Sequence, residues 1–175
     1  MDIWKVIDTY FKSNEYYFTR HHIDSYNDFV INKIPYIIQT LNPFIILKED
    51  SKFRVEVNVS EKVNVCNPTY DSGKLLYPNA ARLQNKNYFC DLRTDIEVIY
   101  YENDIAVHTD VFKDKKIGSI PILLHSKLCY LKGLNVQSLQ SLGECQYDQG
   151  GYFIVDGKEK VIISQERIAT NQLFI

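Results

Sequence analysis

The chain has 175 residues, enough for one domain with a hydrophobic core. Apolar residues make up 45% of it and charged residues 24%, which is typical of globular proteins and excludes an intrinsically disordered chain. The formal net charge of -2 excludes a protein that binds nucleic acid through an overall basic surface. Any contact with nucleic acid therefore has to come from a few Lys and Arg residues placed together.

The N-terminal third predicts two amphipathic helices. In the first, apolar side chains recur at helical spacing from Ile3 to Phe11, and Asp2 is a candidate N-cap. The second covers "HHIDSYNDFVINKIP", and we expect Pro35 to limit its extension. We interpret the aromatic residues of both helices as side chains that pack the helices on a sheet.

Strands follow the helices. "PFIILK" is a candidate strand, and "FRVEVNVS" alternates apolar and polar residues, which indicates a half-buried strand with one wet face. The alternation returns in "KVNVC". Two more strands, "TDIEVIYY" and "IAVHTDVF", flank a turn at "ENDI". Pro121, in the apolar stretch that comes next, indicates a sheet edge or a break in the ladder.

Two short helices and a final hairpin complete the prediction. Pro78 suits the first turn of a helix in "YPNAARLQ", and Asn135 is a candidate cap for "NVQSLQSLGE", with Gly143 near its end. "YFIV" and "KVIIS" flank Asp-Gly, which is the strongest short-range hairpin signal. We therefore predict an α+β fold in which N-terminal helices pack on a mixed, mainly antiparallel sheet that ends in a β-hairpin. We expect a single domain over residues 1–175.

No pattern indicates a metal site or a membrane segment. The four cysteines lack the spacing of zinc ligands, and we interpret them as reduced thiols of an intracellular protein. His21 and His22 are adjacent and would point in different directions on a helix. We find no signal peptide and no apolar run that approaches a membrane span, so we expect a nuclear or cytoplasmic protein without membrane contacts.

The C-terminal segment carries a family resemblance. "GGYFIVDGKEKVIISQERIATN" resembles a segment near the start of the second-largest subunit of multisubunit DNA-directed RNA polymerases. The matching residues are Gly150, Gly151, Phe153, Ile154, Gly157, Glu159, Lys160, Val161, Gln165, Glu166 and Arg167. Three earlier stretches are similar to the same subunit in the same order: "RHHIDSYNDFV", "LYPNAARLQNKNY" and "IGSIPILLHSKLCYL".

The resemblance implies a place within a larger enzyme. In the family this region forms the front of the protrusion domain, on one wall of the DNA cleft, and the lobe and the catalytic regions lie outside this chain. "ERIATN" is similar to the eukaryotic, archaeal and large-DNA-virus subunits. Because Tyr, Ile, Asn and Lys are abundant, we expect an AT-rich and virus-encoded source, which would place the protein in a virus factory or virion.

The enzyme implied is a nucleotidyltransferase. Its two-metal reaction uses Mg²⁺ held mainly by the largest subunit. We find no Asp-x-Asp-x-Asp run and no phosphate-binding loop here. We therefore expect no catalytic residue, no metal ligand and no cofactor in this segment, which should be inactive alone. The implied partners are the largest and the other polymerase subunits, the DNA template, the RNA–DNA hybrid and general transcription factors.

The candidate site residues follow the final turn. Lys158 and Lys160 offer charge to phosphates, and Gln165 and Arg167 could hydrogen-bond to backbone groups near the hybrid. The alternative reading is structural: the lysines would only solvate the hairpin, Glu159 would pair with Arg167, and Gln165 would satisfy a loop.

Two other functions stay open at this point. One is a stand-alone interaction module, derived from the polymerase subunit, that binds transcription factors or polymerase. The other is an independent binder of single-stranded nucleic acid that stacks bases on its aromatic residues. The slightly negative net charge argues against the second alternative. Arg82 is read as an exposed or ion-paired helix residue, with a DNA-facing role as the alternative.

Overall fold

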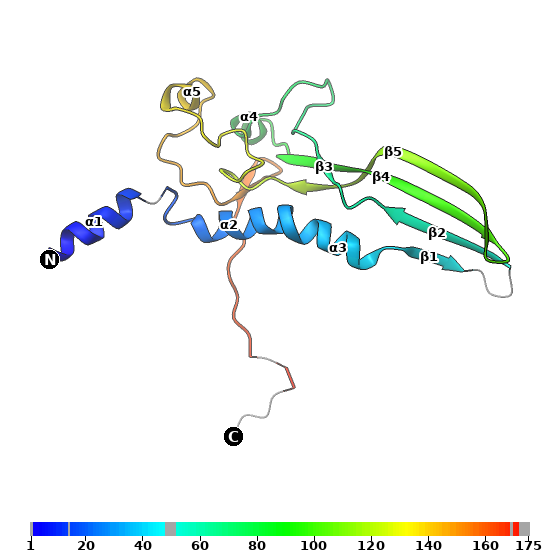
Figure 1. Cartoon of the computed structure of the whole chain (residues 1–175). Coiled ribbons are helices and arrows are strands. Elements are labelled where there is room, and N and C mark those ends of the chain that lie inside the picture. Colours follow the sequence, from blue (N-terminus) through cyan, green and yellow to red (C-terminus); the bar gives the residue numbers. More distant parts are fainter. Residues whose placement is uncertain (1, 14, 48–51, 169, 172–175) are drawn as a thin grey trace.

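The computed structural model describes residues 2–13, 15–47, 52–168 and 170–171. Figure 1 shows a loop-rich body and a long sheet that extends away from it. The helical elements are α1 Ile3–Ser13, α2 Arg20–Asp28, η1 Phe29–Lys33, α3 Ile34–Leu41, α4 Pro78–Leu83 and α5 Val136–Ser141. The strands are β1 Phe44–Leu47, β2 Phe53–Val59, β3 Asn64–Val65, β4 Phe89–Glu102, β5 Ile105–Pro121, β6 Phe153–Val155 and β7 Lys158–Lys160. This combination confirms the α+β class.

Strands β4 and β5 form the long hairpin of the sheet. Asn103 and Asp104 join them with φ values of 51° and 62°, the left-handed values that a type I′ turn requires at both positions. The predicted turn is confirmed, although β4 begins at Phe89, earlier than predicted. β1 pairs with β2, β2 and β3 pair with one edge of β4, and β5 pairs with the other edge. Every strand pair in the described ranges is antiparallel, so the mixed sheet that we expected is not found there.

The second helix continues past the proline that we expected to end it. α2, η1 and α3 form one continuous helical segment that leads into β1 (Figure 1). In a regular α-helix the ring of Pro35 would clash with the carbonyl four residues earlier. Here η1 is a π-helical turn, and the Ile34 N–H donates to the carbonyl of Phe29, five residues earlier. We attribute the continuation through Pro35 to this wider turn.

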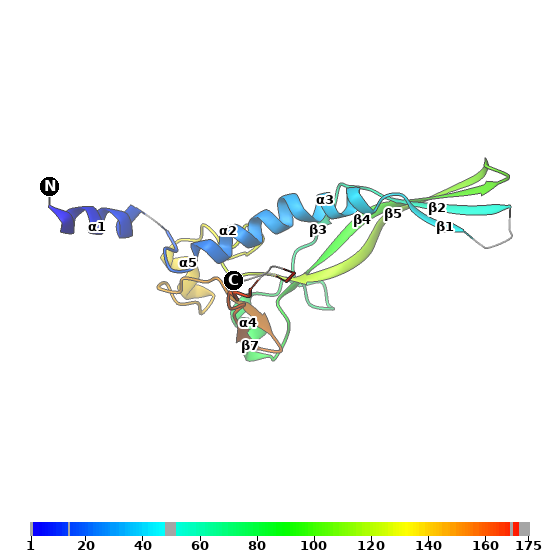
Figure 2. The same ribbon diagram turned by 90° about the horizontal axis from the view of Figure 1, so that it is seen from below.

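The first helix does not pack as predicted. α1 lies apart from the body in Figures 1 and 2, has no buried residue, and leaves Trp4 77% exposed. Packing of its aromatic residues on the sheet is therefore wrong for α1. α2 does pack, because its Ile23 is buried against Leu123 and Phe153. An amphipathic pattern shows that one face of a helix is apolar but not what covers that face.

The sheet is also less covered than its pattern predicts. β2 has the predicted position, but Val55 and Val57 are only partly buried, and so are the alternating polar residues Arg54 and Glu56. The expected contrast between a buried face and a solvent-exposed face of β2 is therefore not found. Apolar side chains of β1 and of the β4–β5 hairpin are also exposed, among them Leu47.

Short-range signals in the body are confirmed. Pro78 opens α4, and Pro121 ends β5, where its carbonyl accepts a 2.7 Å hydrogen bond from the Tyr26 hydroxyl. The Asn135 side chain caps α5 by accepting a bond from the Ser138 N–H at 2.8 Å. None of the described helices is long and apolar enough to cross a membrane.

The main core lies in the body. It brings together α4, the start of β4, the residues after β5, α5 and the β6–β7 hairpin. Its buried members are Leu76, Ala81, Tyr88, Cys90, Ile122, Leu124, Cys129, Leu131, Leu139 and Ile154. Burial raises the pKa of the Cys90 thiol to about 11, so this residue behaves as an apolar core side chain at neutral pH. The core therefore supports the hairpin that carries Lys158 and Lys160, two of the candidate site residues.

Candidate nucleic-acid interface

The β6–β7 hairpin is held against the segment that follows α4. Asp156 and Gly157 form its turn with φ values of 52° and 70°, as predicted for Asp-Gly. The Asp156 N–H donates to the side chain of Asn87 at 2.6 Å, and the Gly157 N–H donates to the carbonyl of Lys86 at 3.1 Å. A Cβ on Gly157 would lie 2.7 Å from the Cα of Asn85. Glycine is therefore required both by the turn and by this close approach.

The second strand of the hairpin is shorter than predicted. β7 has 3 residues, Lys158–Lys160, whereas "KVIIS" predicted a strand that reaches Ser164. Residues 161–168 are exposed and have no regular structure. β-branched side chains favour extended backbone, but a strand also needs a partner for its backbone groups. In the described part of the chain β6 offers only 3 residues, all of them paired.

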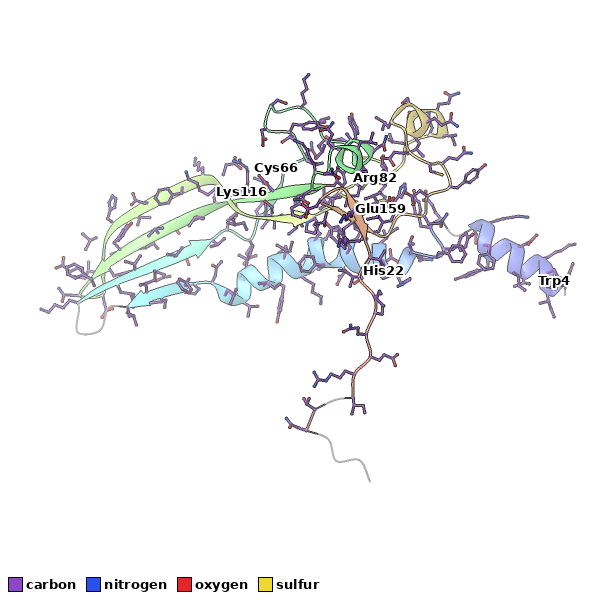
Figure 3. The ribbon with its side chains drawn as sticks, turned by 180° about the vertical axis from the view of Figure 1, so that it is seen from behind. Trp4, His22, Cys66, Arg82, Lys116 and Glu159 are labelled. Carbon is purple, nitrogen blue, oxygen red and sulfur yellow. The ribbon has the colours of Figure 1, made fainter. Side chains whose placement is uncertain are left out.

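A polar cluster around Arg82 fastens the hairpin to α4. The Arg82 guanidinium donates from Nη1 to Glu144 at 2.8 Å, from Nε to Glu159 at 2.8 Å and from Nη2 to the Tyr152 hydroxyl at 2.7 Å. Arg82 and Glu159 point toward each other in Figure 3. The Tyr152 hydroxyl donates to Asp148. We call these five residues the Arg82 cluster.

The Arg82 cluster is partly buried, which strengthens its electrostatics. The side chains of Arg82 and Glu144 are 19% and 3% exposed, while that of Glu159 is 55% exposed. Burial by itself lowers the pKa of Arg82, but the hydrogen bonds and charge of Glu144 and Tyr152 outweigh it and raise the pKa overall. Burial and the bond to Asp148 raise the pKa of Tyr152, so its hydroxyl stays protonated. The interpretation of Arg82 as an ion-paired residue is confirmed. The pair of Glu159 with Arg167, part of the alternative interpretation, is not found, because Glu159 binds Arg82.

The two candidate lysines lie on the other face of β7. Lys160 is paired across the hairpin with Phe153, and Lys158 with Val155. Residues paired across a hairpin share a face, and neighbours along a strand alternate. Glu159, paired with Ile154, therefore shares the face of the hairpin that meets Arg82. Both lysines are exposed and form no ion pair within the described residues.

Gln165 and Arg167 lie further along, in the exposed segment that leaves the body (Figure 1). Neither has a hydrogen bond or ion pair to another described residue, so the structure does not bring them together with Lys158 and Lys160 in one compact site. The four candidates instead follow one another along an exposed stretch of 10 residues, from Lys158 to Arg167. Their role in binding nucleic acid stays a prediction.

Two adjacent glycines connect this hairpin to the N-terminal helices. A Cβ on Gly150 would lie 2.5 Å from Cδ2 of His125, and one on Gly151 would lie 2.6 Å from Cβ of Thr19. Thr19 also donates from its hydroxyl to the carbonyl of Gln149 at 2.6 Å. The Gly-Gly pair is therefore the point where the chain before α2 and the residues after β5 meet the start of the hairpin.

His125 is buried beside this contact. Its ring stacks on Tyr16 with centroids 4.7 Å apart, and neither ring nitrogen has a hydrogen-bond partner in the described ranges. Burial lowers the pKa of His125, although the charges of Asp148, Glu144 and Glu15 oppose that effect. His125 therefore packs as a neutral ring at neutral pH.

The described residues contain no group of three or more His, Cys, Asp or Glu side chains that could hold a metal ion. The rings of His21 and His22 lie next to each other, with centroids 4.1 Å apart. Mg²⁺ in the assembled enzyme stays an expectation that follows from the resemblance.

Sequence reasoning missed the Arg82 cluster. Glu144, Asp148 and Tyr152 are separated from Arg82 by at least 62 residues, and no periodic pattern links residues so distant. A signal was present, because Arg82 belongs to one stretch of the family resemblance and Glu159 to another. The pairing itself becomes visible only when the chain folds.

Comparison with known proteins places the chain in a family. The profile described as "RNA polymerase beta subunit" matches residues 17–173. The chain is 36% identical over 176 residues to DNA-directed RNA polymerase subunit Rpo2N of Methanothermobacter thermautotrophicus, covering 98% of this chain and 32% of the relative. It is 33% identical to RNA polymerase II subunit RPB2 of Encephalitozoon cuniculi and 34% identical to RNA polymerase II subunit 2 of Arabidopsis thaliana. Those matches cover 98% and 99% of this chain, and 16% of each relative.

The chain belongs to the RNA polymerase β-subunit family, the second-largest subunits, and represents their N-terminal region. It spans about a third of the archaeal relative and about a sixth of the eukaryotic ones. The viral source stays a prediction, since these relatives are archaeal and eukaryotic.

Proposed function

We propose that this chain is part of the DNA-cleft wall of a DNA-directed RNA polymerase and supports the RNA–DNA hybrid during transcription. One observation carries the proposal: Lys158 and Lys160 are exposed on β7, while the other strand of the hairpin, β6, is held in place by its buried Phe153 and Ile154. Gln165 and Arg167 follow in the exposed segment after β7, where they would contact a nucleic-acid backbone. Contacts of this kind give affinity without sequence specificity.

Further parts of this proposal concern the whole enzyme. This region would form the protrusion domain, contact the largest and the other subunits, and offer a surface to DNA and to general transcription factors. Nucleotidyl transfer with Mg²⁺ would belong to the assembled enzyme, and the segment alone would be inactive. The protein would act in the nucleus or cytoplasm. If the AT-rich residue usage reflects a viral gene, it would act in a virus factory or virion.

The stand-alone module is the less favoured function. The similarity to polymerase subunits extends over at least 98% of this chain in each of the three relatives described above, and all three are polymerase subunits by name.

The salt dependence of elongation complexes tests the proposed contact. In the assembled polymerase that contains this chain, we expect Lys158→Ala with Lys160→Ala to shorten complex lifetime at raised salt. Each lysine that neutralises a phosphate contributes about 1 to the slope of log affinity against log salt, so the slope should fall by about 2. The matched control is Lys113→Ala with Lys115→Ala, two exposed lysines at the same spacing on β5. An unchanged slope in the β7 variant would contradict the proposal.

A further inference from the structure

We propose that Arg82 is a positioning residue: through Glu159 it fixes which face of β7 turns toward α4, and so presents Lys158 and Lys160 to nucleic acid. This inference rests on the proposed function of the two lysines. Arg82 would touch no nucleic acid itself. Its effect would pass through one hydrogen-bonded ion pair and the side-chain alternation of a 3-residue strand.

Because side chains alternate between the two faces of a strand, the direction of the Glu159 side chain sets the direction of its neighbours on β7. Ile154 is fully buried, and Glu159 lies opposite it on the same face. The carboxylate of Glu159 accepts a hydrogen bond from Arg82 Nε at 2.8 Å, which directs this side chain toward α4. Because neighbouring residues of a strand point to opposite faces, holding Glu159 inward holds both lysines outward.

Arg82 is itself held firmly enough to act as an anchor. Glu144, one of its partners, also accepts a hydrogen bond from the Asn79 N–H at 2.7 Å, at the start of α4. Arg82 therefore has one fixed partner in the body, Glu144, and one on the hairpin, Glu159. Its three donating nitrogens reach three different residues, an arrangement that a lysine ammonium cannot reproduce.

The ion pair of Glu159 with Arg82 also affects the charge beside the two lysines. Glu159 is the residue between the two lysines, and a free carboxylate at that position would weaken their attraction for phosphate. Its pairing with Arg82 turns the carboxylate to the opposite face and compensates its charge there. The exposed face of β7 then carries positive charge alone.

The variant that tests positioning is Glu159→Gln, made in the assembled polymerase. It weakens the link to Arg82 but keeps the size of the side chain. We expect elongation complexes with a lifetime about two to five times shorter at raised salt, a range of about 0.4–1 kcal/mol. If only the local charge mattered, Glu159→Gln would lengthen the lifetime of the complexes, because it removes a negative charge beside the lysines.

The same substitution in a lysine-free background separates positioning from a general structural effect. If Glu159 acts through the lysines, Glu159→Gln should change the lifetime little once Lys158 and Lys160 are Ala. Hydrogen exchange of the assembled enzyme should also show faster exchange of the β7 amides in Glu159→Gln. The control is Asp114→Asn, which weakens an ion pair of similar exposure with Arg93 in the long sheet. It should leave both readouts unchanged.

The outcomes separate the two proposals. An equal loss of lifetime with and without the lysines, or a longer lifetime, would overturn the positioning role, as would unchanged exchange of β7. If the lysine variant alone leaves lifetime and salt slope unchanged, the proposed function fails whatever the exchange shows. Positioning fails by itself if the lysines matter but Glu159→Gln has no effect.

Discussion

Gly150 and Gly151 lie at close contacts that only glycine can make. Gly150 and Gly151 have φ values of 62° and 77°, which L side chains rarely adopt. Each also lies against a neighbour that leaves no room for a Cβ. The family resemblance marks both positions, and the structure supplies the physical reason, which is the close packing of His125 and Thr19 on the start of the hairpin.

Gly150→Ala should destabilise the protein. The new Cβ would meet the ring of His125 and the carbonyl of Leu124, 2.7 Å away, at a strained φ. Strain of this kind costs about 1–3 kcal/mol in the free energy of unfolding, measured by urea denaturation. Gly118→Ala is the control, because nothing lies within 4 Å of its added Cβ and its φ is not in the left-handed region. Equal stability of the two variants would refute the packing described for Gly150.

At the scale of elements, the hairpin depends on the Arg82 cluster for its attachment to the body. Glu144 is nearly buried, so removing Arg82 leaves a carboxylate without its cation in a poorly solvated place. Glu159 is largely exposed and can turn to water. The two acidic partners should therefore contribute unequally to stability, although both lie 2.8 Å from Arg82.

Arg82→Gln should cost much more stability than Glu159→Gln. Leaving one partner of a buried ion pair alone costs about 3–5 kcal/mol, whereas an exposed pair contributes about 0–1 kcal/mol. Urea unfolding of the two variants, followed by circular dichroism, measures both losses. If both variants lose the same small free energy of unfolding, Glu144 does not depend on Arg82 as a buried ion-pair partner.

Local signals predicted the elements whose cause is local. Both Asp-containing turns, the Asn135 cap and the Pro78 helix start follow from a few neighbouring residues, and all were found. The predictions that failed needed non-local information. Pro35 ends a regular helix but not one with a π-turn before it. "VIIS" has strand-forming residues, but in the described residues it has no partner to pair with.

The candidate site was predictable only in part. Lys158 and Lys160 are where the Asp-Gly turn and strand alternation place them, exposed beside the turn. The partner of Glu159 was not predictable, because Arg82 is 77 residues away in sequence. Gln165 and Arg167 were selected by resemblance alone. They lie in an exposed segment and form no hydrogen bond or ion pair with other described residues, so the structure neither supports nor opposes their role in binding nucleic acid.

At the scale of the whole molecule, the exposed apolar surface fits a chain that spans only part of its relatives' length. α1 and the strands of the long sheet carry exposed aromatic and aliphatic side chains, among them Trp4, Phe44, Phe53 and Ile105. Exposed apolar patches of this kind mark surfaces that contact other protein. The β6–β7 hairpin is different, because β6 is held on both faces, by Ile154 in the main core and by Phe153 against Ile23, while Lys158 and Lys160 of β7 are exposed.

The most direct test of the account is a photo-cross-linking measurement on the transcribing enzyme. A photoreactive amino acid would replace Lys160 in one enzyme, Arg167 in a second and Lys113 on β5 in a third, and cross-links to the DNA and RNA strands would be counted. If this segment lies against the hybrid, positions 160 and 167 should cross-link to nucleic acid, and position 113 clearly less often. Cross-links from 160 and 167 that go only to protein, in an enzyme that is actively transcribing, would contradict it.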